Sequence, residues 1–233
     1  IDPDKLALEK GAKVATASVE GGADVILVGG SIGAQGAVLD ETVKMIKEAS
    51  NGLPVVLYPG SPGGLSGYAD AVYFMQMLNS RDVYWLSTAQ IQAAPVVRKL
   101  GIEAIPTSYV IIEPGRAVGW IGNANLVPRE RSDLAAACAL AAKYMGAHAF
   151  ITDSGSGAPE PAPLEMISAI AKTTNHDLLY FYAGGVKNAE QAGDVIKAGA
   201  DGIHVGNAFE TGDVEKRVKD MATAVKREGR KKV

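Results

Sequence analysis

Apolar runs rich in Val and Ile alternate along the chain with longer amphipathic segments. A glycine that ends a helix and then leads into an apolar run occurs at GGADVILVGG (21–30), LGIEAIPTSYVII (100–112), MGAHAFITDS (145–154) and AGADGIHVGN (198–207). Glycine just past a helix supplies the left-handed conformation that stops it. Val/Ile-rich runs that follow such turns are typical of strands buried on both faces. Strands that alternate with helices predict a parallel sheet.

This pattern predicts a modified (β/α)₈ barrel of the α/β class. We expect strands near 1–2, 25–30, 54–58, 71–76, 104–112, 148–153, 178–183 and 202–206. We expect helices near 5–20, 39–49, 88–99, 132–144, 163–173, 188–197 and 213–228. The stretch between Pro59 and Ala71 is too short and too rich in Gly and Pro for an ordinary helix. The third barrel helix is therefore expected to be missing or replaced, which would open the wall to an elongated apolar ligand.

The length of 233 residues is close to the roughly 250 of one such barrel, so we expect a single domain over 1–233. The opening IDPDK reads as the end of a strand, and we expect a short piece of chain before it. A net charge of −3 gives no electrostatic reason to bind nucleic acid. No apolar run is long enough for a transmembrane helix. The single cysteine, Cys138, excludes an intrachain disulfide and favours a reducing cytoplasmic setting.

Two small-residue pairs follow the last two predicted strands. Gly184-Gly185 and Gly206-Asn207 lie 22 residues apart. Parallel strands that end side by side in exposed backbone N–H groups form a cup for a phosphate, and glycine lets the backbone approach the anion. In an eight-stranded barrel this cup lies after the last two strands. The sequence therefore predicts binding of a phosphorylated small molecule.

Other polar residues at predicted strand ends are candidates for chemistry. Asp2 and Ser31 could hold Mg²⁺, which prefers oxygen ligands and shares its shell with water and substrate phosphates. Alternatively, Asp2 caps the first helix before Pro3. Asp153 is the best candidate for a general base, or else it orders its own turn through backbone bonds. Both alternatives stay open on the residues alone.

An aromatic group surrounds the fourth and fifth predicted strands: Tyr73, Phe74, Tyr84, Trp85 and Tyr109. It belongs either to the core or a subunit interface, or to an apolar trough. The segment 113–132 is expected to be a long irregular loop, in which Trp120 is an interface anchor or a ligand cover. For His204, within the last strand, we favour a structural role.

The motifs IDPDK, VGGS, LYPGSP (57–62), IPTSYVIIEPG (105–115), SGSGAP (154–159), AGGV and VGNA occur in this order. In this the chain resembles the geranylgeranylglyceryl phosphate synthase family over essentially its whole length. The resemblance implies a barrel whose third helix is replaced. It also implies Mg²⁺-dependent prenyl transfer from geranylgeranyl diphosphate to the free hydroxyl of sn-glycerol 1-phosphate, which forms the first ether bond of archaeal membrane lipids. It further implies a homo-oligomer, either a dimer or a hexamer.

The resemblance also implies roles for individual residues. Asp2 and Ser31 correspond to the magnesium ligands, and the two small-residue pairs correspond to the phosphate grip. The glycerol-phosphate loop corresponds to Ile151, Thr152, Asp153, Ser154, Gly155, Ser156 and Gly157, where the family usually has YLEAGSG. Ile151 removes a phenol that would bond the ligand, and Asp153 shortens the base by one methylene, so the acceptor must sit differently or a water must intervene. Tyr182 on the neighbouring strand is a candidate for the replacement hydroxyl.

Three other functions remain open at this point. The departures at Ile151 and Asp153 allow a family relative with another prenyl donor or another phosphorylated acceptor. A phosphosugar isomerase of the same barrel type would share the phosphate cup but would need no apolar trough. A non-catalytic protein that binds a phosphorylated ligand would need neither a base nor a metal.

Overall fold

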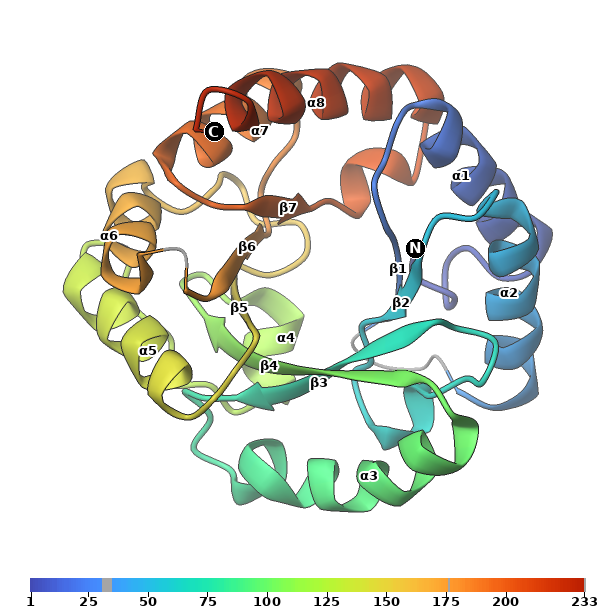
Figure 1. Ribbon diagram of the computed structural model, residues 1–233, viewed down its shortest axis with the longest axis horizontal. Coiled ribbons are helices and arrows are strands. Elements are labelled where there is room, and N and C mark those ends of the chain that lie inside the picture. Colours follow the sequence, from blue (N-terminus) through green and yellow to red (C-terminus); the bar gives the residue numbers. More distant parts are fainter. Residues whose placement is uncertain (31–34, 176, 233) are drawn as a thin grey trace.

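The computed structural model describes residues 1–30, 35–175 and 177–232. Within this part of the chain, seven parallel strands form one sheet in sequence order, and the sheet curves into a nearly closed barrel (Figure 1). The strands are β1 (Ile26–Val28), β2 (Val55–Leu57), β3 (Ala71–Met77), β4 (Glu103–Ile111), β5 (Ala149–Asp153), β6 (Leu179–Ala183) and β7 (Gly202–His204). The predicted α/β barrel class is thereby confirmed.

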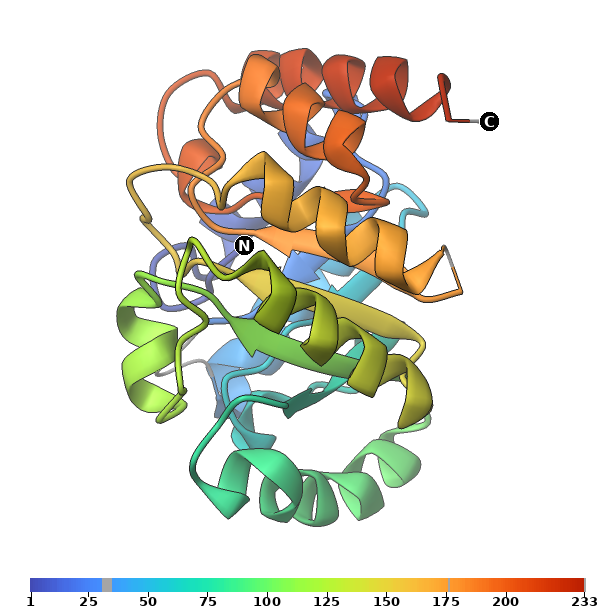
Figure 2. The same cartoon turned by 90° about the vertical axis from the view of Figure 1, so that its left-hand side faces the viewer.

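Helices form a ring outside the sheet. The main ones are α1 (Glu9–Glu20), α2 (Gly36–Ala49), α3 (Ala89–Leu100), α5 (Ser132–Tyr144), α6 (Leu164–Thr174), α7 (Ala189–Ala198) and α8 (Val214–Gly229). A single π-helical turn, η2 (Tyr84–Thr88), leads into α3, and a short 3₁₀ turn, η3 (Asn207–Phe209), follows β7. Figure 2 shows α5, α6 and α7 packed side by side over the outer face of the sheet.

The glycines in the predicted repeat do end helices. Gly101 closes α3 in the left-handed conformation with φ of 72°, and Gly146 follows α5 with φ of 84°. Side chains cap the starts of later helices, since Asn188 accepts from the Gln191 amide and Asp213 accepts from the Lys216 amide. These local signals explain why the predicted helix bounds agree with the structure to within a few residues.

The alternation of side chains in each strand separates two kinds of core. Inward-facing residues such as Tyr109 and Ile151 pack in the barrel interior. Outward-facing residues such as Phe150 and Tyr180 pack against the helices. On β5, Asp153 shares the inward face with Ile151, whereas Thr152 shares the outward face with Phe150. This parity decides which side chains reach the interior of the barrel.

The predicted strand at 1–2 is a correction, because the described residues contain no strand there. The Gly29 amide donates to the Ile1 carbonyl at 3.0 Å, and the Ile1 amino group donates to the Leu27 carbonyl at 2.6 Å, so Ile1 lies beside β1 as a strand residue would. These bonds involve one residue, and a strand requires a longer paired run. The sheet therefore has seven strands rather than the expected eight across the described residues.

Two other segments matter for the site, and only the second differs from the prediction. The helix that a regular barrel has between β2 and β3 is replaced by a 3₁₀ turn, η1 (Pro62–Gly64), whose N-cap Ser61 accepts from the Gly63 amide, as the sequence predicts. The segment 113–132, expected to be irregular, instead contains a short helix, α4 (Arg116–Ile121). The Gly119 amide donates to the Gly115 carbonyl, which is the hydrogen bond of one α-helical turn.

Candidate functional site

A cavity of about 1430 Å³ has the carboxyl ends of the strands in its lining, together with residues at the start of β1 and on α1 and α8. The predicted site residues that line it are Asp2, Asp153, Ser156, Gly157, Gly184, Gly185, Gly206 and Asn207. They come from the loops after β5, β6 and β7 and from the segment that precedes α1. The cavity is thus where the sequence predicts the chemistry, at the end of a barrel that usually bears the active site.

The backbone near β7 has room for an anion. A Cβ added to Gly206 would meet nothing within 4 Å, so this glycine borders open space. In the described part of the chain, the N–H groups of Gly157, Gly185 and Gly206 have no hydrogen-bond acceptor. The Ser156 hydroxyl donates to Oδ1 of Asn207 at 2.6 Å and so ties the loop after β5 to the loop after β7. Unpaired amides beside open space are suited to a phosphate.

The first glycine pair also has a packing role. Gly184 and Gly185 have φ of 91° and 75°, which other residues rarely adopt. A Cβ at Gly185 would lie 2.3 Å from the Glu160 carbonyl oxygen, and one at Gly184 would lie 2.9 Å from Oδ1 of Asp153. The end of β6 therefore touches the loop after β5, and only glycine permits this approach.

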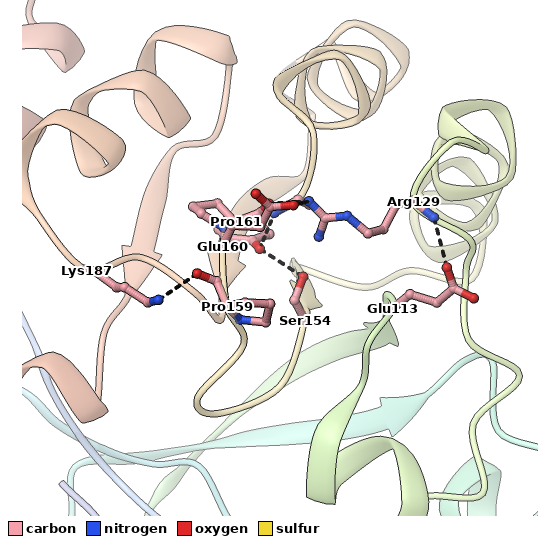
Figure 3. Close-up of polar contacts among 9 residues, drawn as sticks. Glu113, Arg129, Ser154, Pro159, Glu160, Pro161 and Lys187 are labelled. Carbon is pink, nitrogen blue, oxygen red and sulfur yellow. Dashed lines mark hydrogen bonds and ion pairs between the residues drawn. The ribbon is translucent and has the colours of Figure 1, made fainter.

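Two cationic side chains hold the loop after β5 (residues 154–163), and one of them, Lys187, also lines the cavity (Figure 3). Lys187 Nζ donates to the Pro159 carbonyl at 2.6 Å, and Arg129 donates to Oε1 of Glu160 at 2.9 Å and to the Pro161 carbonyl at 2.8 Å. The Arg129 amide in turn donates to Glu113 at 3.4 Å. Backbone carbonyls bonded to cationic side chains give the loop a fixed path. Sequence reasoning missed Arg129 because its partners lie about thirty residues away.

Asp153 is buried at the end of β5, with 7% of its surface exposed. Its Oδ1 accepts from the Gly155 amide at 2.6 Å, and its Oδ2 accepts from the Tyr109 hydroxyl at 2.6 Å. Burial raises the pKa of this carboxyl, while these two bonds act to lower it. The bond to Gly155 shows that Asp153 orders its own turn. It also lines the cavity, and its role as a general base stays a prediction.

Three members of the predicted glycerol-phosphate loop point elsewhere. Thr152 pairs with the Tyr180 hydroxyl at 2.8 Å on the helix side of the sheet, and the Ser154 hydroxyl pairs with that of Tyr182 at 2.9 Å. Ile151 is fully buried in the barrel interior. Their side chains do not line the cavity among the residues described, so any contact with a ligand would be indirect. Gly155 likewise gives its amide to Asp153.

Tyr182, the candidate replacement hydroxyl, is also directed away from the cavity. Its hydroxyl accepts from the Ala162 amide at 2.6 Å and pairs with Ser154. Its side chain is completely buried against the helices. The alternation along β6, which puts Phe181 inward, could have excluded Tyr182 at the start.

The predicted metal side is only partly visible, because Ser31 lies outside the described residues. Oδ1 of Asp2 accepts from the Asp4 amide at 3.1 Å, and Lys5 Nζ lies 3.8 Å from Oδ2 of Asp2 and 2.8 Å from Oε1 of Glu210. Helix α1 begins at Glu9, so Asp2 does not cap it. A Cβ at Gly30 would lie 2.6 Å from Oδ1 of Asp2, so glycine leaves room for the carboxylate.

The carboxylate of Asp2 suits a Mg²⁺ ion that also binds a substrate phosphate. The described residues contain no group of three or more His, Cys, Asp or Glu able to hold a metal by themselves. Mg²⁺ usually takes one or two protein carboxylates and completes its shell with water and phosphate oxygens. The carboxylate of Asp2, which faces the cavity, meets that requirement.

The other part of the cavity is apolar. Its lining includes Leu65, Phe74, Met75, Met77, Trp85 and Ala93. These residues lie on β3, η2, α3 and the segment that replaces the missing helix. Of the predicted aromatic group, Tyr73, Phe74, Trp85 and Tyr109 line the cavity and Tyr84 does not. Trp120 is 85% exposed on α4 and is also absent from the lining among the described residues.

His204 occupies the barrel interior below the glycine cup. Its Nε2 lies 3.3 Å from the Tyr73 hydroxyl, and its ring stacks on Phe181 at 5.1 Å. Within the described residues, its Nδ1 and the Tyr58 hydroxyl are buried without a hydrogen-bond partner. Burial lowers the pKa of His204 to about 3, so the ring is neutral near pH 7. Because His204 also lines the cavity, the structural role favoured from the sequence stays a prediction.

Comparisons with known proteins agree with this geometry. Residues 1–225 match the PcrB family. The geranylgeranylglyceryl phosphate synthase of Methanosarcina acetivorans is 48% identical over 97% of this chain and 91% of its own length. The enzyme of the same name from Thermococcus kodakarensis is 48% identical over 93% of this chain and 85% of its own length. None of the helices described here is long and apolar enough to cross a membrane.

Solved structures show the same fold. The (S)-3-O-geranylgeranylglyceryl phosphate synthase of Thermoplasma acidophilum, in complex with its substrate sn-glycerol-1-phosphate, superposes with a TM-score of 0.93 at 31% identity. That match covers 97% of this chain and 91% of the other. The wild-type enzyme of Thermoplasma volcanium also gives 0.93, at 36% identity over 97% of this chain and 90% of its own. The chain therefore belongs to the PcrB family, together with these geranylgeranylglyceryl phosphate synthases.

Proposed function

We propose that this protein is a prenyltransferase that joins geranylgeranyl diphosphate to sn-glycerol 1-phosphate, giving geranylgeranylglyceryl phosphate and diphosphate. The observation that carries the proposal is one cavity that connects unpaired backbone amides with an apolar lining. The named activity of relatives 48% identical to this chain supports it. A phosphosugar isomerase would have no use for the apolar part.

The acceptor phosphate would lie against the amides of Gly185 and Gly206, with Asn207 and Ser156 beside it. The N–H groups of Gly185 and Gly206 have no acceptor among the described residues, and Gly206 has no side chain to block the approach of a phosphate. The fixed loop 154–163 would limit the movement of the bound acceptor. Much of the rate acceleration would then come from positioning.

Asp153 would act as the general base. Each oxygen of its carboxylate accepts one hydrogen bond and retains a further lone pair. The acceptor hydroxyl would lose its proton to Asp153 while its oxygen bonds to carbon 1 of the prenyl chain. The bond from that carbon to the diphosphate breaks in the same process. The raised pKa of the buried carboxyl makes it a stronger base than an exposed aspartate.

Asp2 and Ser31 would hold Mg²⁺ beside the donor diphosphate. When bound, the ion would supply charge neutralisation for the departing diphosphate. Lys5 lies within reach of Asp2 and Glu210 and would add positive charge on the same side of the cavity. Leu65, Phe74, Met75 and Trp85 would enclose part of the prenyl chain.

We also propose a cytoplasmic homo-oligomer, either a dimer or a hexamer. Trp120, 85% exposed on α4, is a candidate contact residue, since large exposed aromatics are enriched at interfaces. Size-exclusion chromatography with light scattering on the wild type and on Trp120→Ser would test this. An unchanged mass in the variant would remove Trp120 from the interface, and a monomeric wild type would contradict the assembly.

The activity can be tested with labelled prenyl diphosphates of several chain lengths and a panel of phosphorylated acceptors. We expect the fastest transfer with geranylgeranyl diphosphate and sn-glycerol 1-phosphate, and loss of transfer in EDTA that Mg²⁺ restores. A faster reaction with another donor or acceptor would identify a family relative of different specificity. The departures at Ile151 and Asp153 are what motivate this alternative. Phosphosugar isomerisation that persists in EDTA would support the isomerase. Tight binding of glycerol phosphate without turnover would support a binding protein.

A further inference from the structure

The hydroxyl of Tyr109 is the hydrogen-bond donor nearest the proposed base from within the barrel. It reaches Oδ2 of Asp153 at 2.6 Å from the neighbouring strand β4. Tyr109 is 6% exposed and Asp153 is 7% exposed, and both line the cavity. With the Gly155 amide on Oδ1, each carboxylate oxygen has its own donor. The carboxylate is therefore held in one orientation.

We propose that Tyr109 is a positioning residue that fixes the orientation of the Asp153 carboxylate and keeps it in the ionised, proton-accepting form. This inference rests on the proposed function, because it assumes that Asp153 accepts the proton. From the sequence, Tyr109 belonged either to the core or a subunit interface, or to an apolar trough. The proposal gives it a role in the reaction instead.

The surroundings of Asp153 explain why such a donor is needed. Burial favours the neutral acid, which cannot accept a proton, and the bond from Tyr109 counteracts this. The other titratable groups that interact electrostatically with Asp153 are Tyr58, just after β2, and Tyr182, on the opposite face of the sheet, and both are phenols. No cationic side chain contacts Asp153 among residues 1–30, 35–175 and 177–232. Hydrogen bonds are thus the available means of stabilising its charge.

The ring of Tyr109 has a separate structural role. It packs edge-on against Tyr58 with centroids 5.8 Å apart and belongs to the interior core. Phenylalanine would keep this packing and remove only the hydroxyl. Tyr180 offers a matched control, because its equally buried hydroxyl pairs with Thr152 at 2.8 Å on the opposite face of the sheet.

The experiment compares wild type, Tyr109→Phe and Tyr180→Phe by two readouts. The first is the pKa of the Asp153 carboxyl, from NMR titration of protein labelled with ¹³C at aspartate carboxyls and assigned with Asp153→Asn. The second is the apparent pKa on the acidic side of the pH profile of kcat/KM for transfer to sn-glycerol 1-phosphate. We expect Tyr109→Phe to raise both pKa values by about one unit, because it removes a hydrogen bond that stabilises the charged carboxylate. Its rate should recover toward wild type at higher pH, and Tyr180→Phe should move neither value.

Thermal unfolding of the three proteins shows whether both variants fold. An Asp153 pKa that is the same in Tyr109→Phe and wild type overturns the proposal, as does a rate loss that higher pH does not relieve. If no prenyl transfer occurs even in the wild type, the proposed function fails. The NMR titration, which needs no activity, then decides the contact between Tyr109 and Asp153 on its own.

Discussion

The two halves of the barrel have the same strand–helix repeat but different walls. On the β5–β7 side, α5, α6 and α7 cover the sheet (Figure 2), and hydrogen bonds tie the loop after β5 to neighbouring segments. On the β1–β3 side, the helix between β2 and β3 is replaced by the turn η1. Both halves contribute apolar side chains to the cavity lining, but the unpaired amides of Gly157, Gly185 and Gly206 belong to the first half, and Leu65, Phe74, Met75 and Trp85 belong to the second.

Under the proposed function, this difference would let one fold bind a phosphorylated acceptor and a long apolar donor. A phosphate needs donors whose positions do not change, and a complete helix layer with pinned loops supplies them. A long apolar chain needs length and apolar surface, which removal of one helix provides at little cost to the rest of the sheet. We call the β5–β7 side the covered half and the β1–β3 side the open half. Of the predictions below, the first two concern the covered half, the third concerns the open half, and the fourth concerns the barrel interior between them.

The largest effect is expected for Asp153→Asn, which removes the proposed base in the covered half. We expect kcat to fall by about 10²–10⁴-fold, the usual contribution of a general base, with little change in binding of the prenyl donor. Steady-state kinetics with both substrates saturating would measure it. A kcat close to wild type would show that another group, or water, takes the proton.

Glycine substitutions separate the packing and binding roles of the phosphate cup. Gly185→Ala should destabilise the fold by about 3 kcal/mol, because its φ of 75° and the nearby Glu160 carbonyl leave no room for a methyl group. Gly206→Ala should fold normally, since its Cβ meets nothing, yet bind sn-glycerol 1-phosphate about tenfold more weakly. Urea unfolding and calorimetry would measure the two effects. Normal acceptor binding by Gly206→Ala would place the phosphate elsewhere.

In the open half, Met75→Gln should act on the donor alone. Met75 is half-buried, lines the apolar part of the cavity and is about the size of glutamine. An amide that the prenyl chain cannot pair with should raise the KM for geranylgeranyl diphosphate about fivefold. The acceptor KM serves as the internal control. Equal changes in the two KM values would mean that the halves do not bind separate substrates.

The smallest effect concerns His204 and the pH dependence of stability. The folded-state pKa of about 3 lies below the ordinary value of 6.5, so below pH 6.5 the unfolded chain binds a proton that the folded chain does not. The stability due to the neutral ring is present above pH 6.5 and is lost as the pH falls toward 3. Because the residue is only half-buried, we expect wild type to lose about 1 kcal/mol more than His204→Leu between about pH 7 and pH 5. Urea unfolding at the two pH values would measure this, and equal losses would contradict a neutral His204.

The sequence was a good guide where the signal is local. The helix ends at Gly101 and Gly146, the missing helix before Ala71 and the small-residue pairs after β6 and β7 are all visible in short stretches of residues, and the structure contains them. The alternation of side chains along β5 could also be predicted: once Asp153 is placed inward, Thr152 must face the helices. Applying that alternation would have removed Thr152 and Tyr182 from the direct ligand contacts.

The predicted strand at 1–2 shows the limit of local signals. Ile1 has the bonding expected of a strand beside β1, but strand formation depends on how many neighbours pair in sequence. The segment 113–132 shows the same limit, because its several glycines indicate a loop and tertiary packing nonetheless forms α4. A Cβ at Gly119 would lie 3.0 Å from the side chain of Leu126, so the close packing of Leu126 on this helix favours a residue without a side chain there.

The sequence by itself determined the repeat, the gap in the helix ring and the glycine-rich strand ends, because hydrophobic period and backbone freedom are properties of neighbouring residues. The tertiary structure alone decided that Tyr109 meets Asp153 and that Arg129 secures the loop after β5. Those pairings join residues 44 and 32 positions apart, and they depend on the register between strands and the path of each loop. Many registers satisfy the same hydrophobic pattern, but packing of the nearly closed barrel selects one.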